Sequence, residues 1–190
     1  MTSPVSLSPA QAAARLTEFT VIDVRAPGEY AAGHVPGALN IPLDRLDEAL
    51  PALKSASARG ALLVVCASGN RSTRACDLLS AADIEAATLT GGTSAWASEG
   101  HGLERPEGAR ATWPMERQVR LAAGSLVVAG LLAGLRYPAA RWLSAGVGSG
   151  LVFSAVTDTC GMAAALSKLP HNRAPRSAPS LNATLDALQG

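Results

Sequence analysis

Cysteine and histidine are scarce in this sequence, and their scarcity excludes several kinds of site. Among 190 residues there are three of each. The cysteines are an odd number, lie far apart and include no Cys-x-x-Cys pair, which excludes a disulfide framework and a thiolate zinc site. We therefore expect a reducing compartment and no resident metal. The residues concerned are Cys66, Cys76, Cys160, His34, His101 and His171.

The N-terminal segment, MTSPVSLSPAQ, lacks the basic and apolar runs of a cleaved signal peptide. We therefore expect the N-terminal part of the chain to stay in the cytoplasm. The second half lacks acidic residues: residues 1–107 hold 8 Lys/Arg and 12 Asp/Glu, whereas residues 108–190 hold 8 and 3. A basic, acid-poor half suggests contact with anionic lipid or nucleic acid. The length suits one domain with an appendage, or two small domains.

Strands alternate with helices over the first hundred residues. Apolar runs at 20–24 and 61–66, and a run that ends on glycines at 86–92, are typical of strands. The run ALLVVC at 61–66 is continuous rather than alternating, as in a parallel sheet covered on both faces. The pattern predicts a small doubly wound α/β domain, in which ligands bind beyond the carboxyl ends of the strands. Helices are expected after Ser8 and at 44–53, 71–82 and 93–100.

Two later segments, 121–135 and 142–157, carry no charged residue. A helix on the surface of a soluble protein needs a polar face, and neither segment has one. Each is shorter than the roughly 20 residues that span a bilayer. A buried pair of soluble helices is therefore an alternative to a membrane hairpin.

Features at the ends of these segments favour the membrane hairpin. Arg120 and Arg136 can extend the first span by snorkelling, and Thr159 to Ser167 can extend the second past Asp158. Aromatic residues lie at the segment ends, and small residues recur at a spacing of four. More basic residues lie before and after the hairpin than in the turn between its helices. By the positive-inside rule, we expect both termini in the cytoplasm. The aromatic and small residues are Trp113, Tyr137, Trp142, Gly130, Gly134, Gly146 and Gly150.

The stretch CASGNRS at 66–72 follows the strongest strand and precedes a helix. A cysteine at the start of a helix meets the positive end of the helix dipole and unpaired N–H groups, which stabilise its thiolate. The small residues that follow let the loop curl around the sulfur with its amides inward. Arg71 adds a cation for an oxyanion, and Ser72 can cap the helix and donate to the sulfur. We therefore interpret Cys66 as a nucleophile rather than a buried structural cysteine. The expected substrate-binding residues are Ala67, Ser68, Gly69, Asn70, Arg71 and Ser72.

Four sequence motifs resemble those of the rhodanese family in order and spacing. They are VIDVR, EYAAGHVPGALNIP, VVCASGNRS and TLTGGTSAW, and they cover roughly residues 8–104. The resemblance implies a rhodanese fold and a sulfurtransferase without a cofactor. In that family the loop cysteine takes a sulfane sulfur from a donor such as thiosulfate, holds it as a persulfide and passes it to a thiol or to cyanide. By this likeness Cys66 is the nucleophile, the amides from Ala67 to Ser72 cradle the persulfide, and Arg71 binds the donor's sulfonate end.

Two other functions compete with sulfur transfer. Cysteine-based phosphatases and arsenate reductases also combine a cysteine, a loop and an arginine, but their pattern has five intervening residues. Here four residues separate Cys66 from Arg71, and the shorter loop suits a single sulfur atom. The second alternative is a catalytically weak rhodanese module that acts as a membrane-bound sulfur or redox sensor, or as a binding domain. The presence of Cys66 counts against it.

The remaining landmarks of the first hundred residues are expected to serve the fold. Asp23 and Arg25 close a strand, and Glu29 is placed to pair with a nearby arginine. We expect His34 to be a turn histidine with satisfied hydrogen bonds, and Cys76 to pack in the core. A tight strand-to-helix turn with an aromatic packing residue is expected at Gly91, Gly92 and Trp96.

Residues 115–173 carry a second resemblance, to the two-helix hairpin of YgaP-type inner-membrane rhodaneses of bacteria. CGMA and LPHNR are its distinctive sequences. The resemblance implies a multi-pass protein of the bacterial inner membrane, with the lipid bilayer as a partner and with homodimers that form through the hairpin. Cys160 lies at the cytoplasmic end of the second helix. Because the basic residues flank the hairpin, no nucleic-acid partner is needed to explain them.

The expected division of the chain follows from both resemblances. It consists of a rhodanese domain at 1–107, a linker at 108–118, a transmembrane hairpin at 119–168 and a cytoplasmic tail at 169–190. The end of the tail, 174–190, is expected to be loose with one weak helical stretch. The domain at 1–107 is expected to be soluble and active by itself, since it contains the whole CASGNRS loop.

Overall fold

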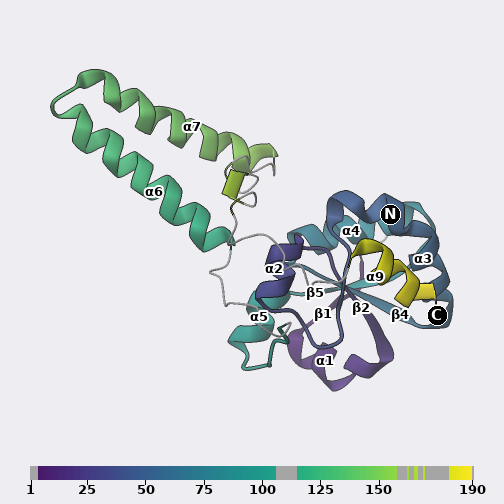
Figure 1. Ribbon diagram of the computed structural model, residues 1–190. Helices are drawn as coiled ribbons and strands as arrows, with labels where there is room; N and C mark the ends of the chain where they lie inside the picture. The colour runs from purple at the N-terminus through teal and green to yellow at the C-terminus, as the bar shows by residue number, and fades with distance from the viewer. Residues whose placement is uncertain are drawn as a thin grey trace. The chain divides into compact units, whose positions relative to one another are not determined.

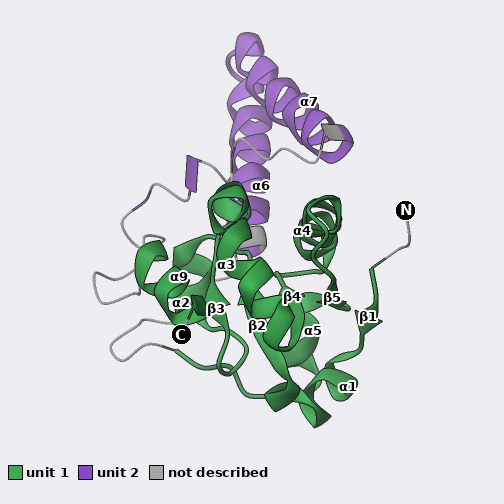
Figure 2. Cartoon of the chain, turned by 90° about the vertical axis from the view of Figure 1, so that its right-hand side faces the viewer, with its two compact units in different colours: residues 1–111, 174–190 green, residues 112–173 purple. Residues whose placement is uncertain are grey.

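The computed structural model describes residues 4–105, 115–157, 162, 165–166, 169 and 180–189. The chain divides into two compact units, coloured separately in Figure 2. One unit comprises residues 1–111 together with 174–190, and the other comprises residues 112–173. The first unit contains the sheet and the cysteine loop, and the second is a pair of helices.

Five parallel strands form the sheet of the first unit (Figure 1), and Figure 2 shows them in the order β1-β5-β4-β2-β3. The central strand β4 pairs with β2 on one side and β5 on the other, with Val65 opposite Asp23 and Val64 opposite Thr88. The doubly wound parallel sheet predicted from the sequence is confirmed, whereas the short edge strand β1 was not predicted. The strands are β1 Ser6–Leu7, β2 Phe19–Asp23, β3 Leu39–Asn40, β4 Ala61–Val65 and β5 Ala86–Leu89.

Helices cover both faces of this sheet. Ser8 caps the first of them: its side chain accepts from the amide of Gln11, whose side chain accepts from the Ser8 amide. The helix expected at 44–53 begins two residues later and continues to Arg59. The helices of this unit are α1 Pro9–Ala14, α2 Pro27–Ala32, α3 Leu46–Arg59, α4 Asn70–Ala81, α5 Gly92–Ser98 and α9 Leu181–Gln189, with 3-10 turns at Leu16–Glu18 and Leu43–Arg45.

The core of the first unit consists of two clusters, one on each face of the sheet. Leu62 and Val64 of β4 pack in a cluster with side chains of α3, α4 and α9. Leu63 and Val65 pack in the other, with α1, α2 and α5. Successive residues of a strand point to opposite faces. A continuous apolar strand is therefore buried on both sides, as predicted from the run ALLVVC.

The C-terminal helix α9 packs against α3 and β3. Leu188 is 2% exposed and belongs to the first core cluster, and Leu181 and Leu185 pack against that cluster. The guanidinium of Arg59 donates a hydrogen bond to the carbonyl of Leu188. The helical stretch expected in the tail is therefore confirmed as α9, whereas the expectation that the tail is loose is wrong for residues 181–189. Their leucines lie at helical spacing and find an apolar surface on the first unit.

The second unit is a helical hairpin, as the sequence predicted. It contains α6 Met115–Gly134, a 3-10 turn at Pro138–Ala140 and α7 Arg141–Thr157. Ser144 of α7 donates to the carbonyl of Val127 in α6 at 2.9 Å. A Cβ atom on Gly134 would lie 2.6 Å from Cγ of Arg141, so this glycine permits close contact inside the hairpin.

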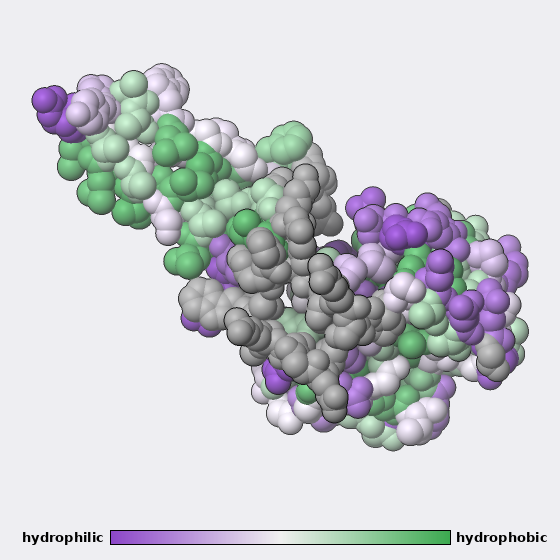
Figure 3. Space-filling model, viewed as in Figure 1, coloured by the Kyte–Doolittle hydropathy of each residue, from purple (hydrophilic) through white to green (hydrophobic). Residues whose placement is uncertain are grey.

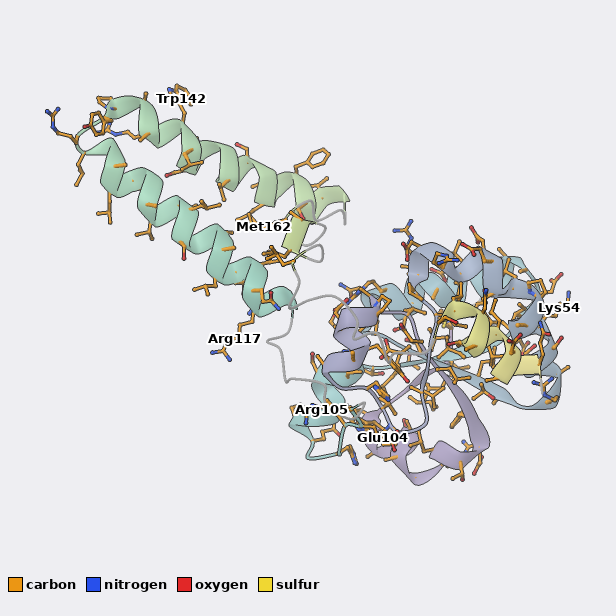
Figure 4. All side chains as sticks on the ribbon, viewed as in Figure 1. Lys54, Glu104, Arg105, Arg117, Trp142 and Met162 are labelled. Carbon is orange, nitrogen blue, oxygen red and sulfur yellow. The ribbon has the colours of Figure 1, made fainter. Side chains whose placement is uncertain are left out.

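Apolar side chains cover much of the hairpin surface that Figure 3 displays. Figure 4 shows Trp142 at the turn end of the hairpin and Arg117 near the other end of α6. Within the described part of the chain, no helix combines the length and apolar character needed to cross a membrane. Trp113, Asp158, Cys160 and His171 lie outside the described residues. The exposed apolar residues of the hairpin include Leu121, Leu126, Val128, Leu131, Leu132, Leu135, Trp142, Leu143, Leu151, Val152, Phe153 and Val156.

Candidate active site

Cys66 lies where the central strand ends and α4 begins, at the carboxyl edge of the sheet. Gly69, which precedes the first helical residue Asn70, has a φ of +104°, a conformation that L side chains rarely adopt. This turn brings the Gly69 amide back to donate to the Cys66 sulfur at 3.1 Å. A glycine is required here because its backbone bends in the left-handed region to reach the thiol.

The sulfur of Cys66 is enclosed by its own loop. The residue exposes 0% of its surface, and its Sγ lies 3.6 Å from the hydroxyl of Ser72, which is also buried. Ala67 and Gly69 are half-buried, and Ser68 and Asn70 are exposed. Of the six expected binding residues, Gly69 and Ser72 contact the sulfur directly.

The turn from β5 to α5 supports the loop through its backbone. The amide of Thr93 donates to the carbonyl of Cys66 at 2.8 Å, and the amide of Ser94 donates to that of Ala67 at 3.1 Å. Gly92 has a φ of +59°, and a Cβ atom there would overlap the Cys66 carbonyl and lie 2.7 Å from the carbonyl carbon of Ala67. The predicted tight turn is confirmed, and it fixes the cysteine loop from a neighbouring strand.

Arg71 forms a two-pronged ion pair with Glu29 of α2. Its Nη1 and Nη2 atoms donate to Oε2 and Oε1 of Glu29, each at 2.8 Å. The arginine partner expected for Glu29 is thereby confirmed. Burial by itself raises the pKa of Glu29, but the hydrogen bonds and charge of Arg71, together with Arg25 and the Ala26 amide, outweigh it and lower that pKa. The guanidinium is therefore held in place by a carboxylate that cancels much of its charge.

Asp23 and Arg25 form a buried pair that serves the fold, as predicted. Nη2 of Arg25 lies 2.7 Å from the Asp23 carboxylate and donates to the Gly33 carbonyl at 2.7 Å. His34 is 7% exposed, and its Nδ1 lies 3.0 Å from the carbonyl of Tyr30. The expected turn histidine with satisfied hydrogen bonds is confirmed.

Cys76 is a core residue, as expected. It is 3% exposed, and burial, with smaller effects of Asp77 and Cys66, raises its pKa to about 12. Such a thiol stays protonated at neutral pH and is a poor nucleophile. Of the cysteines in the described part of the chain, Cys66 and Cys76 are both free.

Sequence reasoning missed one residue of this site, Thr88 of β5. Its Oγ1 atom lies 2.6 Å from the hydroxyl of Ser72, and both residues are buried. The signal in the sequence was a single hydroxyl in the strand AATL. A single threonine in a strand does not reveal its hydrogen-bond partner. Ser72 lies 16 positions earlier in the sequence and contacts Thr88 only in the folded protein.

Two protein families match the chain, one in each unit. Residues 8–99 match the family described as rhodanese-like domain, and residues 114–177 match the transmembrane domain of YgaP-like inner membrane proteins. The two matches follow one another in the order predicted from the sequence.

Individual proteins agree with the family matches. An uncharacterized protein of Synechocystis sp. is 38% identical over 155 residues, which are 80% of this chain and 84% of that protein. A sulfurtransferase of Allochromatium vinosum is 33% identical over 105 residues, 54% of this chain and 94% of its own length. The crystal structure of a rhodanese-related protein from Thermoplasma volcanium superposes with a TM-score of 0.50 and 30% identity, covering 54% of this chain and 99% of the other. The chain belongs to the rhodanese family, as a member in which a rhodanese domain is followed by a YgaP-like transmembrane domain.

Proposed function

We propose that this protein is a sulfurtransferase that moves a sulfane sulfur from a donor such as thiosulfate to a thiol or cyanide acceptor. The observation that carries the proposal is the contact between the Gly69 amide and the Cys66 sulfur, at 3.1 Å, where β4 meets α4. A hydrogen bond from a fixed amide stabilises a negatively charged sulfur, and the start of the helix adds its dipole. Both favour the thiolate as nucleophile.

The proposed reaction consists of two displacements. In the first, the Cys66 thiolate attacks the outer sulfur of thiosulfate, a sulfur–sulfur bond forms, and sulfite leaves with the electron pair of the broken bond. In the second, cyanide attacks the outer sulfur of the Cys66 persulfide, and thiocyanate leaves while the thiolate is restored. A thiol acceptor, reacting as its thiolate, becomes a persulfide in the same way. Covalent catalysis of this kind needs no cofactor.

The loop residues have distinct proposed roles. The amides from Ala67 to Ser72 cradle the outer sulfur of the persulfide, and Ser72 donates to the sulfur of Cys66. Arg71 binds the sulfonate end of the donor, although its guanidinium is paired with Glu29 at 2.8 Å. The donor therefore has to compete with Glu29, or share Arg71 with it.

Four residues between Cys66 and Arg71 support sulfur over phosphate chemistry. A tetrahedral phosphate needs a wider ring of amides than one sulfur atom does. The alternative of a catalytically weak sensor or binding module gains some support from the complete burial of Cys66 and from the pairing of Arg71. A measurement of sulfur-transfer turnover distinguishes an active sulfurtransferase from such a module.

The test is a pair of measurements on the full chain. Intact mass spectrometry after thiosulfate treatment is expected to show one added sulfur, and the treated protein is expected to convert cyanide to thiocyanate. Cys66→Ser removes the proposed nucleophile, so we expect it to abolish both results and to retain the fold. Cys76→Ser is the matched control and is expected to keep most of the activity, since that thiol is buried in the core and protonated.

The outcomes separate the candidate functions. Equal turnover in the Cys66→Ser variant contradicts the assignment of the nucleophile. A wild-type protein that gains a sulfur but does not pass it on supports the sensor. Preferential hydrolysis of an aryl phosphate contradicts the inference from loop length.

We also propose that the second unit anchors the enzyme in the bacterial inner membrane. The match to a YgaP-like transmembrane domain and the exposed apolar side chains of α6 and α7 support this anchor. Both termini and the rhodanese domain then lie in the cytoplasm, because basic residues flank the hairpin. The proposed assembly is a homodimer formed through the hairpins, without nucleic acid.

A further inference from the structure

Thr88 brings a hydroxyl group into the core next to the cysteine loop. The residue is 4% exposed, and its Oγ1 lies 2.6 Å from Oγ of Ser72. A buried hydroxyl costs free energy unless it makes a hydrogen bond. Ser72 is that partner here, so a side-chain hydrogen bond joins β5 to the first turn of α4.

Ser72 connects Thr88 to the sulfur. Its Oγ lies 3.6 Å from Cys66 Sγ and donates to the carbonyl of Gly69 at 2.9 Å. A hydroxyl has one hydrogen and two lone pairs. With its hydrogen on the Gly69 carbonyl, Ser72 can accept from both Thr88 and the Cys66 thiol. All three side-chain protons then have acceptors while Cys66 is protonated.

Loss of the thiol proton to solvent changes which group donates. The thiolate is an acceptor, so the hydrogen of Ser72 can turn from the Gly69 carbonyl to the sulfur. The carbonyl keeps partners, because Thr73 donates to it from its amide at 2.9 Å and from its hydroxyl at 3.0 Å. Thr88 can donate to Ser72 before and after this turn.

We infer that Thr88 is a positioning residue that stabilises the Cys66 thiolate through Ser72. Its hydrogen bond fixes the Ser72 hydroxyl beside the sulfur and leaves the hydrogen of Ser72 free to turn. A hydroxyl that accepts a hydrogen bond also donates more strongly. The inference rests on the proposed function in one respect, that Cys66 acts as a thiolate nucleophile.

The substitutions that test this inference alter no charged group near Cys66. Arg71 couples electrostatically to Cys66 and is paired with Glu29. Asp23 is paired with Arg25 at the end of β2, and Cys76 of α4 stays protonated. A change confined to the hydroxyl groups therefore reports their contribution alone.

The test measures how fast iodoacetamide alkylates Cys66 at different pH values, by peptide mass spectrometry of the full chain in detergent. Thr88→Val keeps the side-chain shape and removes the hydroxyl. We expect it to move the midpoint of the pH profile upward by about half a pH unit. Thr88→Ser restores the hydroxyl and the midpoint. Thr90→Val removes an exposed hydroxyl beyond the same strand and leaves the midpoint unchanged.

A double variant tests whether Thr88 acts through Ser72. We expect Ser72→Ala to raise the midpoint by about one pH unit, and Thr88→Val to add nothing to it. An unshifted midpoint in Thr88→Val, or additive shifts in the double variant, overturns the inference. If Thr88→Val does not fold, Thr88→Ala takes its place. Alkylation needs no turnover, so failure of sulfur transfer refutes the proposed function and leaves this measurement valid.

Discussion

At the scale of single residues, Glu29 has two opposing effects on the loop arginine. It holds the Arg71 guanidinium by two hydrogen bonds of 2.8 Å, and its negative charge offsets the positive charge that an anionic donor would meet. Its side chain is 13% exposed, so solvent screens this effect little. In the proposed reaction, we therefore expect the affinity for thiosulfate to depend on Glu29, which takes no part in the two displacements.

Glu29→Gln separates the two effects. We expect the KM for thiosulfate to fall several-fold, because the dianion no longer competes with a carboxylate for Arg71. The free energy of unfolding is expected to fall by about 1 kcal/mol, since the ion pair is lost. Steady-state kinetics and urea denaturation measure both. Glu48→Gln, which breaks the exposed pair with Arg45, is the control that leaves KM unchanged. A higher KM in Glu29→Gln would show that orientation outweighs charge.

The same residue predicts a pH dependence of stability. Because folding lowers the pKa of Glu29, its carboxylate stabilises the folded state above its unfolded pKa, about 4.3, and that contribution is lost as the pH falls through the lower folded value. The difference in unfolding free energy between wild type and Glu29→Gln should therefore be constant near neutral pH and shrink below about pH 4. Denaturation curves at several pH values test this, and a difference that grows on acidification contradicts the ion pair.

At the scale of elements, α9 changes what is expected of the isolated rhodanese domain. Residues 1–107 lack this helix, so the surface of α3 that Leu188 covers would be exposed to water. The CASGNRS loop is still complete in that fragment. We now expect it to be less stable than the whole chain rather than an independent equivalent of it.

Leu188→Ala in the full chain tests the contribution of α9. The side chain is 2% exposed, and a buried leucine typically contributes about 3 kcal/mol over alanine, so we expect a loss of that order in unfolding free energy. Gln189→Ala, one position further on an exposed face, should change it by less than about 0.5 kcal/mol. Thermal or urea unfolding of the first unit gives both values. Equal stability of the two variants would mean that α9 does not hold its place on α3.

Elements that are long and continuous were predictable from the sequence, and those that depend on distant partners were not. The run ALLVVC predicted β4 because a strand buried on both faces is a continuous run of apolar residues, which is visible in the sequence without knowledge of its partners. Strand β1 is two residues long and exists through pairing with β5. The leucines of α9 have helical spacing, but their binding surface comes from residues more than 120 positions earlier. Cys66 was found as part of a contiguous motif, whereas Thr88 contributes from another strand.

At the scale of the whole molecule, two pairs of hairpin glycines at a spacing of four differ in their surroundings. Gly130 and Gly134 of α6 meet Ser144 and Arg141 of α7, inside the hairpin. A Cβ atom on Gly146 or Gly150 would have no neighbour within 4 Å. Gly146 and Gly150 therefore form a strip without side chains on α7, which the backbone of another helix can approach closely.

Replacing Gly146 and Gly150 together by leucine is expected to weaken the proposed homodimer, because bulky side chains keep helix backbones apart. Crosslinking of the full-length protein in detergent measures the dimer, and intact sulfurtransferase activity shows that the first unit still folds. Gly124→Leu is the matched control, since a Cβ atom there also has open space but lies on α6. An unchanged dimer in the double variant would place the interface on another face.

The docking of α9 also sets an order of events during synthesis. A ribosome makes β4 and the cysteine loop first, then α6 and α7, and only afterwards residues 181–189. The cluster beneath α3 stays open until Leu188 has emerged, because that side chain belongs to it. The helices α6 and α7 are thus made while the first unit still lacks α9. The nascent chain therefore completes its first unit only after the helices of the second unit have been made.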